Sequence, residues 1–455
     1  MKRKTLSIML LILICGLTLS VLPGAALSKT LKWAFQGDAS SLDPHALNET
    51  FQIAFLGNLY EGLVRRDTDL KIEPCLAERW EAVEPTRWRF HLRKGVKFHN
   101  GNDFNADDVI FTFKRTKSEG SDFKTRISTV KEVIKVDDYT VDVVTTQPNP
   151  ILVSEWSTWY IMDKEWSEKN GATESTNIKS GKENYATRHV NGTGPFIVTE
   201  RQTDVKTVMK PFSGWWDTPK HNLTEVIFTP IASDATRVAA LLTGEIDMMY
   251  PVPVQDIKRV NSNATTEVLT GPELRTIYLG FNQSDDTLNG SNIKGKNPLK
   301  DVRVRQAFYQ AINTDAIKEK IMRGLSDPSA LLISPQLFPS FAKDFKRRSY
   351  DPVVAKELLA QAGYPDGFEL DMDCPNNRYV NDEQICQAAV SMLAKIGVKV
   401  NLNAQPKAQY FKKVLAYDTD FFLVGWTPLS FDSYNVLFNL IGSRDNETGR
   451  GKFNL

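Results

Sequence analysis

Apolar and polar residues alternate along the first half of the chain, which is the pattern of strands with one buried face. The alternation is clear at residues 31–35, at residues 88–92 and at residues 141–145. We therefore expect strands at these places, with a mostly antiparallel β segment over about residues 68–193.

Turn residues follow the second of these strands. Lys94-Gly95 is expected to turn the chain from residues 88–92 into a partner at residues 96–98, and Asn100-Gly101 marks a second turn. The pattern predicts a β-hairpin in this stretch.

Beyond residue 300 the apolar positions repeat with the helical period, and helices alternate with strands. Asp351 and Pro352 predict the cap and the first position of one helix, and Gly363 predicts its end. Residues 368–374 then alternate as a strand.

The same order of elements continues after this strand. Asn381 is expected to cap the next helix, with Gln384 as its capping-box partner, and Gly397 to close it. Another strand begins at residue 398, and the continuous apolar run at residues 421–425 predicts a strand buried on both faces. This order predicts βαβ architecture with a parallel sheet.

Arg378 and Tyr379 fall in the loop between the end of a predicted strand and the start of a predicted helix. In open α/β sheets ligands bind at that edge, and a helix N-terminus beside an arginine favours an anion such as a carboxylate. Trp426 ends the next strand at the same edge, so its indole could form a wall of the same pocket. The alternative from pattern alone is a solvated Arg378 and a Trp426 that packs in the core.

The N-terminus has the features of a secretory signal peptide. Lys2, Arg3 and Lys4 precede the apolar run 6–22, and cleavage is expected near Ser28. The alternatives are an uncleaved membrane anchor and a lipoprotein modified on Cys15, which lacks the small preceding residue of that pattern. Cleavage removes three positive charges and no negative ones, so the formal net charge of +1 becomes −2. This charge excludes nucleic acid as an expected partner.

Export changes the meaning of the three remaining cysteines. In an oxidising compartment Cys374 and Cys386 are expected to form a disulfide and Cys75 to stay a free, buried thiol. Two separate thiols are the alternative. The disulfide would stabilise the fold by about 3 kcal/mol and would hold the loop that carries Arg378.

Composition indicates a large globular protein of two or three domains, with 41% hydrophobic and 24% charged residues. The five histidines form no HExxH pair, and the chain has no GxSxG elbow, phosphate loop or CxxC pair. We therefore expect no catalytic residues, no cofactor and no dedicated metal site. A secreted hydrolase is the weaker alternative.

Seven stretches together resemble the extracellular solute-binding proteins of ABC importers, in the peptide/nickel family (family five). They occur in the family's order from about residue 30 to the end of the chain. The stretches are LVRRDTDLKIEPCLAERWE, WRFHLRKGVKFHNGNDFNADDVIFTFKR, NGTGPFIV, TRVAALLTGEIDMM, VRVRQAFYQAIN, AKELLAQAGYPDGFEL and MLAKIGVKV.

The resemblance implies a two-lobed α/β periplasmic-binding-protein fold of type II, with mixed sheets, an extra subdomain on the first lobe and the ligand in the hinge cleft. Relatives usually continue beyond GRGKFNL and return to the first lobe, so the sequence is expected to be truncated at its C-terminus. The expected boundaries are 1–28 for the signal peptide, 29–67 and 194–272 for lobe I, 68–193 for its subdomain, and 273–455 for lobe II.

The resemblance also assigns site residues. An arginine at the place of Arg378 anchors the ligand carboxylate in peptide-binding members, and an acid after Gly-Trp takes the α-amino group. Asp432 is the only carboxylate in that stretch here, and its partner could instead be a protein group. Leu429 and Tyr434 stand where dipeptide-binding relatives tend to carry further acids, which makes a free amino group a weaker expectation. The expected ligand contacts are Arg378, Tyr379, Asn381, Trp426, Thr427 and Asp432.

The implied function is that of a monomeric periplasmic or extracellular receptor. It would capture a small solute, foremost a di- or oligopeptide, by closing its lobes, and deliver it to a membrane permease powered by an ATPase. The alternatives are an opine, a sugar or a chelated metal as ligand, or a sensory role with a chemoreceptor.

Overall fold

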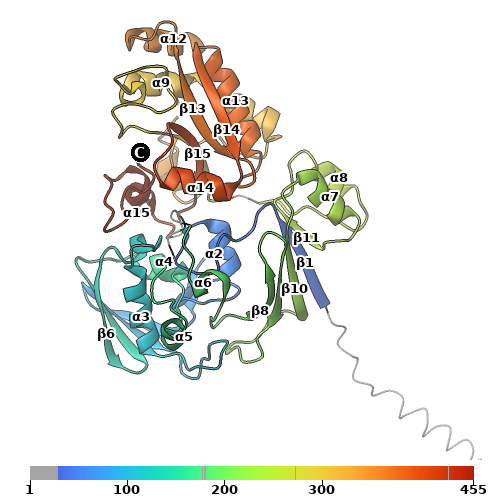
Figure 1. Ribbon diagram of the computed structural model, residues 1–455, viewed down its shortest axis with the longest axis vertical. Coiled ribbons are helices and arrows are strands. Elements are labelled where there is room, and N and C mark those ends of the chain that lie inside the picture. Colours follow the sequence, from blue (N-terminus) through green and yellow to red (C-terminus); the bar gives the residue numbers. More distant parts are fainter. Residues whose placement is uncertain (1–28, 177, 179–180, 272, 429) are drawn as a thin grey trace, which may run out of the picture.

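The computed structural model describes residues 29–176, 178, 181–271, 273–428 and 430–455. The signal-peptide prediction on residues 1–28 and the prediction on Leu429 lie outside the described residues. The chain forms two lobes, one from the blue to green segments and one from the yellow to red segments (Figure 1). None of the helices in the described part is long and apolar enough to cross a membrane.

Lobe I is built around a five-stranded mixed sheet with the order β11-β1-β10-β9-β8. The strand β1 runs parallel to β10 and to the edge strand β11, while β9 is antiparallel to both β10 and β8. Its elements are β1 (Lys29–Phe35), α2 (Thr50–Leu56), β8 (Phe196–Gln202), β9 (Lys206–Pro211), β10 (Leu223–Pro230), α7 (Asp234–Leu242), β11 (Met248–Tyr250) and α8 (Ile257–Asn261).

An antiparallel sheet with the order β4-β5-β7-β6 extends lobe I. The helix α3 packs on this sheet. A two-stranded ribbon of β2 and β3 comes directly before β4 in the sequence. The elements are β2 (Val64–Arg66), β3 (Ile72–Pro74), β4 (Ala77–Glu84), β5 (Arg87–Leu92), α3 (Ala106–Thr116), η1 (Lys124–Ile127), β6 (Val130–Asp137), β7 (Thr140–Thr145), α4 (Leu152–Glu155), η2 (Trp156–Thr158), α5 (Lys164–Lys169) and α6 (Tyr185–Arg188).

The predicted hairpin between residues 88–92 and 96–98 is wrong. The strand β5 pairs with β4 on one side and with β7 on the other, so both of its edges are filled. The chain does turn at Gly95, but residues 96–98 contribute only an isolated bridge from Lys97 to Asp103.

Lobe II has a four-stranded mixed sheet with the order β12-β15-β13-β14. The strands β13, β14 and β15 are parallel, as predicted, and β12 adds an antiparallel edge. The elements are β12 (Thr276–Phe281), η4 (Pro298–Lys300), α9 (Val302–Ala311), α10 (Thr314–Ala316), η5 (Ile317–Ile321), α11 (Pro339–Ala342), α12 (Pro352–Gln361), β13 (Phe368–Pro375), α13 (Asp382–Ala394), β14 (Val398–Gln405), α14 (Lys407–Leu415), β15 (Phe421–Trp426), α15 (Ser433–Val436) and η6 (Leu437–Ile441).

The helix α12 begins and ends as its sequence predicts. The Asp351 side chain accepts hydrogen bonds from the backbone N–H groups of Val353 and Val354, both at 3.0 Å. Pro352 is the first helical residue, and Gly363 follows the helix with φ +94°. A glycine adopts this left-handed conformation without the steric cost that a Cβ brings.

The capping box predicted for α13 is wrong. Asn381 precedes the helix with φ 54° and ψ 32°, and its side chain makes no cap hydrogen bond. A side-chain cap requires an extended backbone at that position. The Asn381 amide instead donates to the carbonyl of Ile321 at 2.9 Å.

Each lobe has its own hydrophobic core. A further cluster covers one face of β15. This third cluster combines residues of α14 and β15 with Leu47 from lobe I and with Phe453 and Leu455 from the last described segment. Apolar packing therefore continues from lobe II to the boundary with lobe I.

Candidate ligand-binding site

The loop between β13 and α13 is closed by a disulfide between Cys374 and Cys386, whose Cα atoms are 6.6 Å apart. Cys374 lies in β13 and Cys386 is the fifth residue of α13. Among the described cysteines Cys75 is free and buried. The predicted pairing is confirmed, and the disulfide joins the strand before the loop to the helix after it.

Asp382 orders the backbone of this loop. Its carboxylate accepts hydrogen bonds from the backbone N–H groups of Arg378 and Tyr379, both at 2.9 Å. Burial raises the pKa of Asp382 to about 6 against the lowering effect of these N–H donors. The loop conformation thus depends on a carboxylate that the sequence analysis did not single out.

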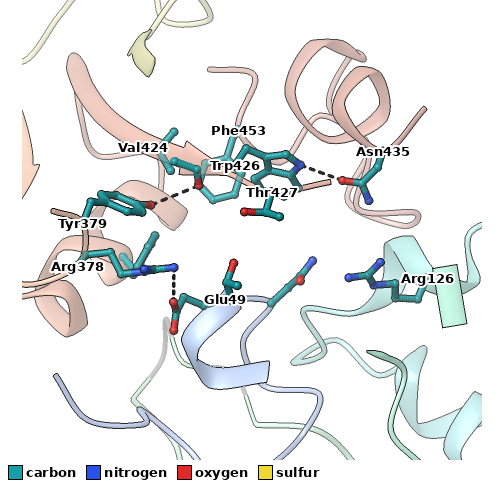
Figure 2. A pocket seen from close by; sticks show the side chains of 13 residues that line it. Glu49, Arg126, Arg378, Tyr379, Val424, Trp426, Thr427, Asn435 and Phe453 are labelled. Carbon is teal, nitrogen blue, oxygen red and sulfur yellow. Dashed lines mark hydrogen bonds and ion pairs between the residues drawn. The ribbon is translucent and has the colours of Figure 1, made fainter. Parts of the chain in front are cut away.

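A small cavity of about 30 Å³, partly open to solvent, lies between the two lobes. Lobe II contributes Arg378, Tyr379 and Trp426, and lobe I contributes Glu49 and Arg126 from the opposite side (Figure 2). The remaining lining residues are Asn48, Thr50, Phe411, Val424, Gly425, Thr427, Asn435 and Phe453.

Arg378 forms an ion pair across the lobes with Glu49. One guanidinium nitrogen lies 2.5 Å from Glu49 Oε1, and only 6% of the Arg378 surface is exposed. Lys407 Nζ lies 3.6 Å from Glu49 Oε2, so two cations share one carboxylate. Arg378 Nε has no hydrogen-bond partner among the described residues.

Glu49 is positioned by the helix that follows it. Its carboxylate accepts hydrogen bonds from the backbone N–H groups of Phe51 at 2.9 Å and Gln52 at 3.0 Å, which caps α2. Burial opposes ionisation of Glu49, but the charges of Arg378 and Lys407 and these two N–H donors outweigh it and lower its pKa to about 2. Burial lowers the pKa of Lys407.

Aromatic side chains form the wall on the lobe II side. The Tyr379 ring lies 4.6 Å from the Arg378 guanidinium carbon, and its hydroxyl donates to the carbonyl of Gly425 at 3.4 Å. Trp426 donates from Nε1 to Asn435 Oδ1 at 2.9 Å and meets Phe453 edge to face, with centroids 5.5 Å apart. The indole face is thereby held in one orientation.

Arg126, like Glu49, is a cavity residue that the sequence analysis missed. It belongs to η1 of lobe I, has 3% of its surface exposed, and has no partner for Nε or Nη1 among the described residues. Burial lowers its pKa to about 10. The stretch around it, SDFKTRIST, has no motif and lies about 250 residues from the loop of Arg378, so no local signal marks it.

Four of the six predicted ligand contacts line this cavity: Arg378, Tyr379, Trp426 and Thr427. Asn381 instead lines a second, larger space of about 210 Å³, together with Gln36 and Arg237. Asp432 is half-buried and caps α15 by accepting a hydrogen bond from the backbone N–H of Tyr434 at 2.8 Å. Its carboxylate thus has a protein partner.

In the described part of the chain no group of three or more His, Cys, Asp or Glu side chains is placed to hold a metal ion. Among the described residues that line the cavity, the polar groups are guanidinium, amide and hydroxyl groups with a single carboxylate, Glu49. This set is suited to binding an organic anion rather than a bare cation.

Residues 71–448 match the bacterial extracellular solute-binding proteins of family 5. The chain belongs to this family. The family 5 chain is 30% identical over 467 residues to the dipeptide-binding protein of Escherichia coli strain K12. The alignment covers 95% of this chain and 83% of that protein.

Solved structures give the same result for this family 5 protein. The binding protein DppA from Helicobacter pylori in complex with the peptide STSA is 26% identical, with a TM-score of 0.79 over 90% of this chain and 80% of that one. AgaA from A. tumefaciens R10 in complex with agropinic acid is also 26% identical, with a TM-score of 0.77 over 91% and 81% of the two chains.

These similarities confirm the predicted fold class, an α/β periplasmic-binding-protein fold with mixed sheets. Family 5 members are extracellular or periplasmic proteins that bind solutes for ABC import and are not enzymes. The chain is therefore a solute-binding protein of an ABC import system.

Proposed function

We propose that this receptor captures a di- or oligopeptide between its lobes and presents it to a membrane permease that is powered by an ATPase. The observation that supports a peptide is the chemistry of the residues that line the cavity; its volume of about 30 Å³ is too small for a peptide, so the lobes must open to admit one. An arginine with an unpartnered Nε, a fixed indole and an aromatic wall meet between the lobes, and lobe I closes the opposite side. A guanidinium binds a carboxylate by charge-assisted hydrogen bonds, and the aromatic wall suits an apolar side chain.

Contacts from both lobes make ligand binding favour the closed state. A peptide carboxylate at Arg378 would share the guanidinium with the Glu49 carboxylate. It would also be attracted by the charge of Lys407, which lies close to Glu49. The named ligands of two relatives, a dipeptide and the peptide STSA, support this proposal.

An opine is the second candidate ligand. Asp432, the carboxylate expected to take an α-amino group, caps α15 and does not line the cavity. A ligand without a free α-amino group would need no such acid. The relative AgaA in complex with agropinic acid supports this alternative.

Native mass spectrometry of the full-length mature protein, followed by thermal-shift measurements, tests the proposal. The ligands are di- to pentapeptides, the same peptides with an acetylated N-terminus, opines, sugars and chelated nickel. We expect free peptides to raise Tm, and Arg378→Ala to weaken them at least about tenfold. Lys413→Ala is the control, because Lys413 pairs with Asp373 in lobe II and does not line the cavity.

Two results would contradict the peptide assignment. Stabilisation by opines or acetylated peptides alone would favour the second candidate. Stabilisation by a sugar or by chelated nickel alone would leave the receptor role in place and remove the peptide. Equal peptide binding by Arg378→Ala and the control would remove Arg378 from the site.

A further inference from the structure

Arg126 is a buried cation that faces the cavity without an ionic partner. Figure 2 shows its guanidinium directed into the cavity from the lobe I side, while Arg378 lies on the other side. No acid among the described residues comes within the 4.0 Å of an ion pair with it. A buried charge with no paired group is costly, and such groups are usually satisfied by a binding partner.

Glu155 is the acid whose charge acts on Arg126, and it is engaged elsewhere. Its Oε2 accepts a hydrogen bond from the Asn149 amide at 3.0 Å. Burial raises the pKa of Glu155 to about 7, so its charge near neutral pH is only partial. Glu155 therefore leaves the Arg126 guanidinium without full neutralisation.

The opposite end of the cavity also presents a cationic donor, Arg378. Arg378 and Lys407 share the carboxylate of Glu49 there, and the carboxyl groups of Asp382 and Asp38 also act on them. Thr427 Oγ1 is a further cavity group without a hydrogen-bond partner among the described residues. The cavity thus presents donors and positive charge at two separate places.

We propose that Arg126 binds a second acidic group of the ligand, so that the receptor prefers peptides with an acidic side chain. This inference rests on the proposed peptide function. Arg378 takes one carboxylate, Arg126 takes the other, and the apolar wall formed by Trp426 and Phe453 covers the part between them. Arg126 is then the residue that determines specificity, while Arg378 is required for peptides in general.

Isothermal titration calorimetry with matched peptides tests this inference on the mature protein. The pairs differ only by Glu against Gln, at each position of alanine di- and tripeptides. We expect at least one Glu peptide to bind about tenfold more tightly than its Gln partner. Arg126→Gln should bring that ratio to about one and leave the Gln peptides within about threefold of wild type.

Lys124→Gln is the matched control, because it removes the same charge from η1 outside the cavity. It should keep the preference. A crystal structure of the wild-type protein with the preferred Glu peptide is the second measurement, and it decides the matter even if Arg126→Gln does not fold. The side-chain carboxylate should lie within hydrogen-bond distance of Arg126.

The outcomes separate the two proposals. Binding of Glu and Gln peptides with equal affinity, a preference that survives in folded Arg126→Gln, or a carboxylate placed away from Arg126 overturns the inference and leaves the peptide function intact. Binding of no peptide at all by the wild-type protein overturns both.

Discussion

Glu49 of lobe I and Arg378 of lobe II are joined by a buried ion pair of 2.5 Å, and Glu49 caps its own helix at the same time. The Arg378 guanidinium, which was expected to bind a ligand carboxylate, therefore already contacts a carboxylate of the protein. This pair links the ligand-binding loop to the first turn of α2, so its removal should affect both stability and lobe closure.

Glu49→Gln should lower the free energy of unfolding by about 3 kcal/mol, because it leaves Arg378 and Lys407 buried without their shared anion. Urea denaturation of the ligand-free protein measures this change. Glu73→Gln is the control, since Glu73 pairs with Arg65 near the surface and should cost no more than about 1 kcal/mol. Equal losses in the two variants would show that the buried pair has no special role.

Lobe closure gives a second readout of the same pair. Without the attraction between Glu49 and Arg378, the ligand-free Glu49→Gln protein should populate open conformations more than wild type. Small-angle X-ray scattering should then give a larger radius of gyration for the variant. An unchanged radius in a folded variant would mean that the ion pair does not favour the closed state.

Acid should weaken the contribution of Glu49. Its pKa of about 2 in the folded protein lies below the ordinary value of 4.5, so the unfolded chain binds more protons between these values. The stabilisation is present above about pH 4.5 and is lost as the pH falls towards 2. The stability difference between wild type and Glu49→Gln, measured from pH 6 to 2, should shrink over this window. A constant difference would contradict the assigned ionisation.

Glu155 should act in the opposite direction. Its pKa of about 7 lies above the ordinary 4.5, so the folded protein holds the proton more tightly and loses stability as the pH rises from 4.5 past 7. Glu155→Gln should remove up to about 3 kcal/mol of that loss and should be more stable than wild type at pH 8. Unfolding curves at pH 5 and pH 8 compare the two proteins, and parallel changes would refute the prediction.

The disulfide should be detectable by chemistry alone. Thiol counting on the denatured, unreduced mature protein should find one thiol, that of Cys75, and reduction should release two more. Replacing Cys374 and Cys386 by Ser should cost about 3 kcal/mol of stability. A count of three thiols before reduction would disprove the bridge.

The sequence could predict those parts of the fold that depend on nearby residues. The helix α12 is marked by Asp351, Pro352 and Gly363, and the parallel strands of lobe II are marked by their apolar runs. The capping box at Asn381 failed because a left-handed backbone at that residue is set by the loop around it. The hairpin at residues 96–98 failed because β7, about 50 residues away, occupies the edge of β5.

The candidate site divides in the same way. Arg378, Tyr379 and Trp426 follow or end strands, where topology predicts ligand contacts, and the family resemblance added Thr427. Glu49 and Arg126 reach the cavity only because lobe I folds against lobe II, and nothing in their own neighbourhood in the sequence indicates this. Contacts between lobes are pairings of distant segments, which periodicity and capping signals do not encode.

The two hydrogen bonds that Glu49 accepts from Phe51 and Gln52 both come from its own lobe. They need no contact from lobe II, so we expect the carboxylate to keep its direction when the lobes separate. The Arg378 guanidinium contacts the Tyr379 ring of its own lobe, but its ion pair and that of Lys407 cross to lobe I, so both side chains should lose rotamer freedom when the cleft closes. Lobe I is thus preorganised at Glu49, and the conformational entropy lost on closing comes mainly from the side chains of lobe II.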